Sequence, residues 1–285
     1  GERGSKQKII QGEGGRFKVS PHLSSVYVMR SRLVLAIVFL ETAVRIGAPT
    51  APADLAAIQA FYVSTNGTRW REGFTWQNGI EGGLDPCDNL EYYKGLTCNG
   101  AGGDPNRQIT QIWLSAMSLE GTLPPNFGDM TAMTQLYLTY NNISGTIPET
   151  ICNISSLLFL ELSQNKMTGT IPDCINKLQK LQKWDTRNNM LTGTIPASFG
   201  QLSELQSLYL SSNRLTGTVP AALFDAKRVE VLFLSYNELE GTVPRIFSRY
   251  KIKETASMQG LSWMDLRSNN LQGTYPDMMA LLAAV

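Results

Sequence analysis

Side chains able to carry out catalytic or metal chemistry are scarce in this sequence. Its 285 residues include one histidine, His22, and four cysteines. His22 precedes the part of the chain that we expect to fold, so that part has no imidazole. This excludes Ser–His–Asp and Cys–His nucleophile pairs and histidine metal sites. No spacing singles out a pair of carboxylates or a lysine, and we predict no catalytic residue, no metal and no cofactor.

Charge is spread unevenly along the chain, whose formal net charge is +1. Residues 1–53 carry eight of the 25 basic and three of the 24 acidic residues, which leaves a net charge of −4 on residues 54–285. A mildly acidic segment is poorly suited to nucleic acid, because phosphate contacts need clustered Lys and Arg. We therefore expect no nucleic-acid partner.

The N-terminal region has the order of a secretory signal peptide. The basic residues 29–32 precede eight apolar residues, 33–40, and the small-x-small triplet 51–53 follows. The apolar run is far shorter than the roughly 20 residues that span a bilayer. We predict a signal peptide at 29–53, behind a disordered and non-native extension at 1–28, and hence a secreted or cell-surface protein. The alternative is a disordered basic tail followed by a short buried helix.

A repeat dominates the remainder of the chain. Prolines recur every 24 residues, and an eight-residue insertion lengthens the last interval. They are Pro124, Pro148, Pro172, Pro196, Pro220, Pro244 and Pro276. Asparagine recurs in the same register, except that Met117 takes its place in the first copy. The asparagines are Asn141, Asn165, Asn189, Asn213, Asn237 and Asn269. A glycine column completes the phrase, as in Leu208-Tyr-Leu-Ser-Ser-Asn213-Arg-Leu-Thr-Gly217-Thr-Val-Pro220.

This phrase resembles the plant-type leucine-rich repeat, L-x-x-L-x-L-x-x-N-x-L-x-G-x-I-P, over residues 109–285. The resemblance implies an α/β-type solenoid of seven repeats, with short parallel strands on the concave face and 3-10 or helical turns on the convex face. Alternating leucines face inward as in a strand, and the asparagines form a buried ladder of amide hydrogen bonds. Single repeats cannot bury a core, so stacking provides the stability. No polar capping repeat follows Pro276, and we expect the solenoid to be truncated.

Residues 54–108 do not repeat and resemble the N-terminal cap of such proteins. Leu55, Ile58 and Phe61 are spaced as one face of a helix, and a turn follows at 64–67. The resemblance implies that Cys87 and Cys98 form a disulfide, which requires an oxidising compartment.

Cys152 and Cys174 lie on the convex side of adjacent repeats, where they either form a second disulfide or remain free thiols. The sequence favours two free thiols. Three glycosylation sequons begin at Asn66, Asn142 and Asn153. For a secreted protein, Asn66 and Asn153 are the better sites, because Asn142 adjoins the buried ladder.

Four positions of each repeat are expected to face outward on the concave side. Aromatic residues occupy eight of these 28 positions, compared with 9% of the whole chain. Exposed aromatics with a few charges are typical of recognition surfaces. The predicted ligand-binding residues are Trp113, Tyr137, Tyr140, Phe159, Glu161, Asp185, Arg187, Tyr209, Phe233, Tyr236, Trp263, Asp265 and Arg267.

These features predict an extracellular recognition module that is not an enzyme. Its partner would be a protein, peptide or glycan on the concave face, as the family resemblance implies for receptor-like ectodomains and polygalacturonase-inhibitor-like proteins. The alternative is a secreted structural, adhesive or enzyme-inhibitor protein of the cell surface. Residues 1–285 hold no kinase motif.

Overall fold

A computed structural model describes residues 50–71, 75–100, 107–242 and 261–272, all of which belong to one compact unit. The predicted extension at 1–28 and nearly all of the predicted signal peptide lie outside the described residues. The insertion between Pro244 and Pro276 and the last 13 residues also lie outside them. The predictions for these segments stay predictions.

One strand from each repeat joins an eight-stranded sheet. Its order is β1 (Leu96–Cys98), β2 (Ile109–Trp113), β4 (Gln135–Tyr137), β6 (Phe159–Glu161), β8 (Lys183–Asp185), β9 (Ser207–Tyr209), β10 (Val231–Phe233) and β12 (Trp263–Asp265). β1, from the cap, is antiparallel to β2, and all other neighbours are parallel. Equivalent residues of successive repeats stand side by side, as Leu136 does with Leu160. The 24-residue period therefore becomes a row across the sheet.

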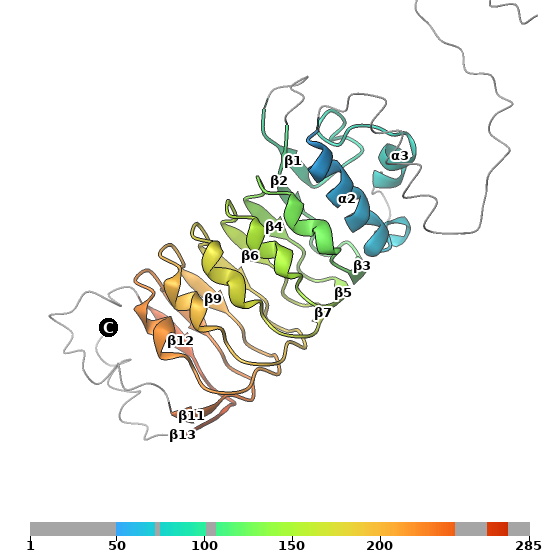
Figure 1. Cartoon of the computed structure of the whole chain (residues 1–285). Helices are drawn as coiled ribbons and strands as arrows, with labels where there is room; N and C mark the ends of the chain where they lie inside the picture. Colours follow the sequence, from blue (N-terminus) through green and yellow to red (C-terminus); the bar gives the residue numbers. More distant parts are fainter. Residues whose placement is uncertain (1–49, 72–74, 101–106, 243–260, 273–285) are drawn as a thin grey trace, which may run out of the picture. The chain divides into compact units, whose positions relative to one another are not determined.

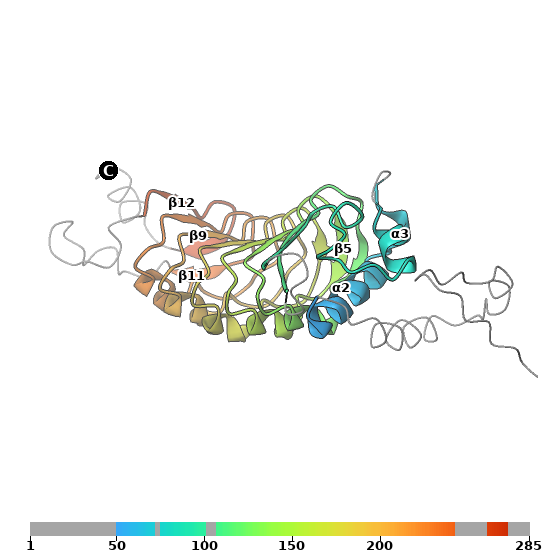
Figure 2. The same cartoon turned by 90° about the horizontal axis from the view of Figure 1, so that it is seen from above.

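A row of 3-10 helices covers the opposite side of the repeats (Figures 1 and 2). These are η3 (Pro125–Asp129), η4 (Glu149–Asn153), η5 (Asp173–Lys177), η6 (Ala197–Gln201) and η7 (Ala221–Asp225). Each helix follows directly on a proline of the repeat, whose backbone is extended. Proline suits this place because its φ is fixed and it has no N–H to leave unpaired.

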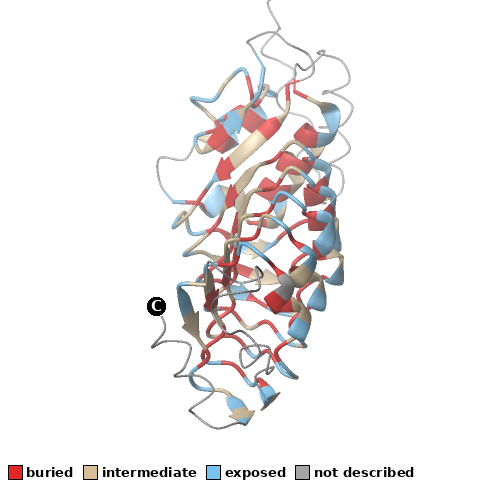
Figure 3. Cartoon of the chain, turned by 90° about the vertical axis from the view of Figure 1, so that its left-hand side faces the viewer, coloured by how far each residue is buried: buried red, intermediate tan, exposed pale blue. Residues whose placement is uncertain are grey.

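Two smaller parallel sheets are formed by short strands that follow the strands of the large sheet along the chain. One contains β3 (Glu120–Thr122), β5 (Asn142–Gly145) and β7 (Lys166–Met167), and the other contains β11 (Glu240–Thr242) and β13 (Asn270–Gln272). The core runs between the large sheet and the helices, where Figure 3 shows the buried residues. In β9 and just beyond it, Leu208 and Leu210 are completely buried, as the alternating pattern predicts. The predicted leucine-rich-repeat solenoid is confirmed.

The asparagine column forms the expected ladder. The side-chain amide of Asn165 donates to the carbonyl oxygens of Leu138 and Leu162 at 2.9 and 3.0 Å. Its oxygen accepts the backbone N–H of Ile143 at 3.0 Å. Each asparagine thus joins its own turn to the preceding repeat, and buried backbone groups are satisfied without water.

The cap begins with α2 (Pro52–Ser64), followed by η2 (Gly67–Arg69) and α3 (Trp76–Glu81). The predicted helical face is buried, and the ring of Phe61 packs edge-on against Phe127 of the first 3-10 helix at 5.3 Å. Helix α2 starts inside the predicted signal segment. Thr50 is also buried and donates its backbone N–H to Asp85 at 2.8 Å. No helix in the described residues is long and apolar enough to cross a membrane.

Both cysteine pairs are disulfides. Cys87 and Cys98 are joined as the family resemblance implied, with a Cα–Cα distance of 5.7 Å. Cys152 and Cys174 are joined as well, at a Cα–Cα distance of 5.9 Å, so the preference for free thiols was wrong. Their separation in the sequence did not predict this bond, whereas stacking of adjacent repeats brings Cys152, near the end of η4, within disulfide reach of Cys174, near the start of η5.

The buried Asp54, in the first turn of α2, makes the stability of the cap depend on pH. Its carboxylate accepts the backbone N–H of Ile109 at 2.6 Å, but its second oxygen has no partner in the described residues. Burial raises its pKa from 3.8 to about 6, the Ile109 hydrogen bond lowers it, and the charge of Asp129 adds to the increase. The carboxyl group of Asp54 therefore binds a proton more tightly in the folded state than in the unfolded state.

We expect the protonated Asp54 carboxyl group to make its full contribution to the free energy of unfolding below pH 3.8. This contribution should be lost as the pH rises towards 6. Relative to the variant Asp54→Asn, which does not titrate, the wild-type chain should lose about 2 kcal/mol of unfolding free energy across that window. Urea unfolding at several pH values measures the difference. Parallel curves for the two chains would contradict the prediction.

Candidate ligand-binding face

The outward face of the eight-stranded sheet, here called the concave face, displays the predicted site residues. Six of the large apolar side chains in the described part of the chain are exposed, and four of these are predicted site residues. The four are Trp113, Tyr140, Tyr236 and Trp263. Phe159 lies on β6 between Gln135 and Lys183 and is half-buried.

Two pairs of aromatic residues lie on neighbouring strands of this face. In the first pair, Trp113 of β2 and Tyr137 of β4 have ring centroids 4.5 Å apart, and the rings are inclined by 46°. In the second pair, Tyr209 of β9 and Phe233 of β10 meet edge to face at 5.3 Å. Parallel pairing at a 24-residue offset produces both pairs, because it places equivalent outward positions next to each other.

Charged side chains occupy the two strands between the aromatic pairs. Lys183 of β8 donates to Glu161 of β6 at 2.7 Å. Arg187 binds Asp185 through Nε and Nη2 at 3.0 and 2.7 Å. The guanidinium carbon of Arg187 lies 4.4 Å from the ring centroid of Tyr209, and the ammonium of Lys183 lies 5.4 Å from it. The site thus has a charged centre that is connected to the second aromatic pair by cation–π contacts.

The environment shifts the pKa of two groups in this centre. Partial burial, followed by the charge of Glu161, raises the pKa of the Tyr137 hydroxyl, so Tyr137 stays neutral and available as a donor. The hydrogen bonds to Asp185 are the largest cause that raises the pKa of Arg187, which keeps its positive charge fixed. Neither group is poised for proton transfer near neutral pH.

The expectation that Asp185 faces solvent was wrong. The Asp185 side chain is only 2% exposed, while that of Arg187 is 34% exposed. Asp265 and Arg267 repeat this pairing on β12, at 2.8 Å, in a more exposed setting. There the Arg267 hydrogen bonds lower the pKa of Asp265 to about 2. In both pairs the arginine is the more exposed partner, and the aspartate holds it through charge-assisted hydrogen bonds.

Two positions that follow each strand were also expected to face outward, but their exposure to solvent varies. Ser163, Ser211 and Ser235 are buried, and the hydroxyl of Ser235 donates to that of Ser211 at 3.0 Å. Tyr140 and Tyr236 stand one residue before the ladder asparagine, with φ of 57° and 56°. This left-handed turn directs the chain away from the sheet and leaves both tyrosines more than half exposed.

Lys183 was missing from the predicted site, although it stands in an outward column. The sequence could have indicated Lys183, because it lies 22 residues after Glu161. This spacing places the two opposite charges diagonally across neighbouring strands. The predicted residues from Trp113 to Phe233 form a continuous row through Glu161 and Asp185.

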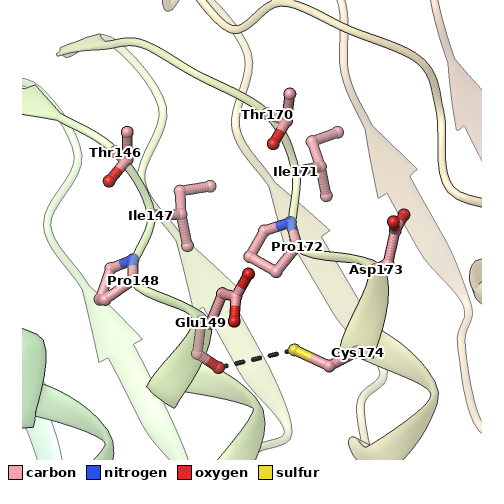
Figure 4. Close-up of a pocket in the computed structure, with 9 residues that line it drawn as sticks. All are labelled: Thr146, Ile147, Pro148, Glu149, Thr170, Ile171, Pro172, Asp173 and Cys174. Carbon is pink, nitrogen blue, oxygen red and sulfur yellow. Dashed lines mark hydrogen bonds between the residues drawn. The ribbon is translucent and has the colours of Figure 1, made fainter.

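A shallow hollow of about 480 Å³ lies elsewhere, between the repeats that carry Pro148 and Pro172 (Figure 4). Its lining alternates threonine, isoleucine and proline from two adjacent repeats. In the close-up, the sulfur of Cys174 faces the carbonyl oxygen of Glu149, 3.5 Å away. The carboxylates of Glu149 and Asp173 also line the hollow, and we assign it no role.

Profiles of the leucine-rich-repeat family match residues 132–154, 156–178, 179–239 and 203–250. Together with the asparagine ladder and the repeated strand and 3-10 helix, these matches decide the family. The chain is a plant-type leucine-rich-repeat protein. No curated protein matches its sequence.

Solved structures similar to this leucine-rich-repeat protein include plant receptors. It is 28% identical to the chain in the crystal structure of PEPR1-AtPEP1, with a TM-score of 0.63, over 78% of this chain and 29% of that one. It is 28% identical to a pollen receptor kinase 3, with a TM-score of 0.55, over 70% of this chain and 88% of that one.

A third similar structure is the ectodomain of the plant membrane receptor kinase GASSHO1/SCHENGEN3 from Arabidopsis thaliana, in complex with CASPARIAN STRIP INTEGRITY FACTOR 2. Identity is 28% and the TM-score 0.51, over 68% of this chain and 28% of that one. The leucine-rich-repeat protein therefore spans less than a third of the PEPR1-AtPEP1 and GASSHO1/SCHENGEN3 chains. Its fold is that of plant receptor ectodomains, and no catalytic family matches it.

Proposed function

We propose that this leucine-rich-repeat protein is an extracellular recognition module that binds a macromolecular partner on its concave face. The observation that carries the proposal is the concentration of exposed aromatic side chains there, including Trp113, Tyr140 and Tyr236. Burial does not require these side chains at such positions, and aromatic residues are common hot spots of interfaces. The similarity to a receptor ectodomain in complex with another molecule supports the same role.

An extracellular location is part of the proposal. Two disulfides are consistent with an oxidising compartment, and the structural relatives include a receptor ectodomain. Among the predicted glycosylation sites, Asn153 is exposed at the end of η4, whereas Asn66 and Asn142 are half-buried. We therefore favour Asn153 as the modified residue.

The proposal is tested with a partner isolated from an extracellular extract and then purified. Replacing Tyr137, Tyr209 and Phe233 together by serine should weaken its binding at least 100-fold, because each is a candidate hot spot worth about 1–2 kcal/mol or more. The three side chains are half-buried and face the sheet surface, so the circular dichroism spectrum should stay unchanged.

A matched control replaces three exposed lysines by serine in or just after the 3-10 helices. They are Lys177, Lys180 and Lys227. This variant should bind the partner as the unmodified chain does, as measured by surface plasmon resonance. If the aromatic variant binds with unchanged affinity, the concave face is not the binding site.

A further inference from the structure

The two aromatic pairs of the concave face are separated by a fixed distance. Tyr137 of the first pair and Tyr209 of the second stand in one row of the sheet, with Glu161 and Asp185 between them. Three strand spacings separate the two tyrosines, or about 14 Å. Because the strands are hydrogen-bonded in register, this separation is built into the solenoid and does not depend on a flexible loop.

The space between the pairs carries two positive and two negative charges that compensate one another. Glu161 is neutralised by Lys183 at 2.7 Å and Asp185 by Arg187 at 2.7 Å. Their side chains are between 2% and 34% exposed, so both pairs are partly shielded from water. A charged ligand group would have to be desolvated there without an unpaired charge to receive it. The centre of the face therefore favours an uncharged ligand segment.

The aromatic pairs suit inserted side chains better than stacked sugar rings. Their rings are inclined by 46° and 81°, so neither pair forms a flat platform. The ring of Tyr209 already carries the guanidinium of Arg187 at 4.4 Å. An inclined pair instead forms a corner that can surround one apolar side chain.

The charged centre still offers hydrogen bonds to a neutral chain. Arg187 uses Nε and Nη2 for Asp185, and its Nη1 group has no hydrogen-bond partner within the described residues. A peptide carbonyl can accept a hydrogen bond from this group without breaking the ion pair. A peptide backbone therefore fits between the two aromatic pairs.

On the basis of the proposed function, we infer that the ligand is an extended peptide with two large apolar side chains four residues apart and uncharged residues between them. An extended chain covers about 3.3–3.6 Å per residue, so about 14 Å corresponds to positions i and i+4. Side chains of an extended chain alternate in direction, and only even separations place both anchors on the protein side. Separations of three or five residues point one anchor away.

A random 12-residue peptide library selected on the immobilised chain, with counter-selection on the Tyr137, Tyr209 and Phe233 triple serine variant, tests this inference. Selected peptides should share large apolar residues at i and i+4 without charge between them. In synthetic peptides, moving one anchor to i+3 or i+5 should weaken binding at least tenfold, as measured by fluorescence polarisation. Different spacing, a charged middle segment or no enrichment would overturn the inference.

A variant of the charged centre provides an independent measurement. Lys183→Gln leaves Glu161 without its partner, so this variant should select peptides with a basic residue between the two anchors. Unchanged selection would contradict the compensated centre. Peptides that lose binding to the triple variant but lack the spacing overturn the inference and leave the proposed function standing. A purified partner that binds the triple variant normally overturns both.

Discussion

Replacing Trp184 by leucine is expected to lower the free energy of unfolding by about 3 kcal/mol, although most repeats carry leucine at this position. Trp184 is completely buried, packs edge-on against Phe199 at 5.5 Å, and donates its indole N–H to the hydroxyl of Thr186 at 3.1 Å. Leucine would leave a cavity and a buried hydroxyl without its donor. Leucine is costly at position 184 because Thr186 also stands where the other repeats have leucine. The large Trp184 and the small Thr186 together fill the space that two leucines fill in most of those repeats.

A double-mutant cycle measures this pairing. Thr186→Leu alone should also cost about 3 kcal/mol, since it overpacks the core and removes the acceptor of the indole. The double variant Trp184→Leu/Thr186→Leu restores the pattern of the other repeats and should lie within about 1 kcal/mol of the wild type. Chemical denaturation of the four chains gives the coupling energy. Strictly additive losses would show that the two residues act independently.

Replacing Asn189 by aspartate is expected to destabilise the solenoid more than replacing it by alanine. The Asn189 amide donates to the carbonyl oxygens of Leu162 and Thr186, and its oxygen accepts the N–H of Met167. Alanine leaves the Met167 N–H unpaired, at a cost of about 2 kcal/mol, while the carbonyls keep donors from neighbouring asparagines. Aspartate places a buried negative charge against those carbonyls, which should cost more than about 3 kcal/mol at pH 7.

Asn188→Asp is the matched control, because Asn188 is the exposed neighbour of Asn189 in the sequence. Its effect should be within about 0.5 kcal/mol. Urea unfolding monitored by circular dichroism compares the three variants. Equal stability of the aspartate and alanine variants at position 189 would mean that the ladder is accessible to water.

Much of the fold was predictable because the repeated phrase encodes local structure. The leucine alternation at Leu208 and Leu210 specifies an inward strand face, and each asparagine completes hydrogen bonds within its own turn and the adjacent one. The helix of the cap was predictable from the spacing of Leu55, Ile58 and Phe61. The rows of the concave face follow from the same period, since parallel strands in register place residues 24 apart side by side.

Contacts between non-equivalent positions were not predictable from the period. The Cys152–Cys174 disulfide joins positions 22 residues apart, and only the approach of η4 and η5 brings them together. The period also did not predict that Asp185 is buried and held by two hydrogen bonds from Arg187. In the candidate site, the sequence identified the aromatic positions, but not that Lys183 neutralises Glu161.

One column of the repeat illustrates the difference between what the repeated phrase predicts and what the packing of adjacent repeats decides. Its residues in four successive repeats are Gly128, Cys152, Asn176 and Gly200. A Cβ atom at Gly200 would lie 1.8 Å from the carbonyl oxygen of Ala222, and one at Gly128 equally close to that of Thr150. The phrase does not require glycine there, because the column also accepts cysteine and asparagine.

The sequence by itself therefore determined the solenoid, its strand faces and its ladder, because these depend on contacts that every repeat makes in the same way. The tertiary structure decided how closely each pair of repeats approaches, which cysteines join and which charges cancel. These features depend on the particular side chains that two neighbouring repeats bring into contact, and no single repeat contains that information.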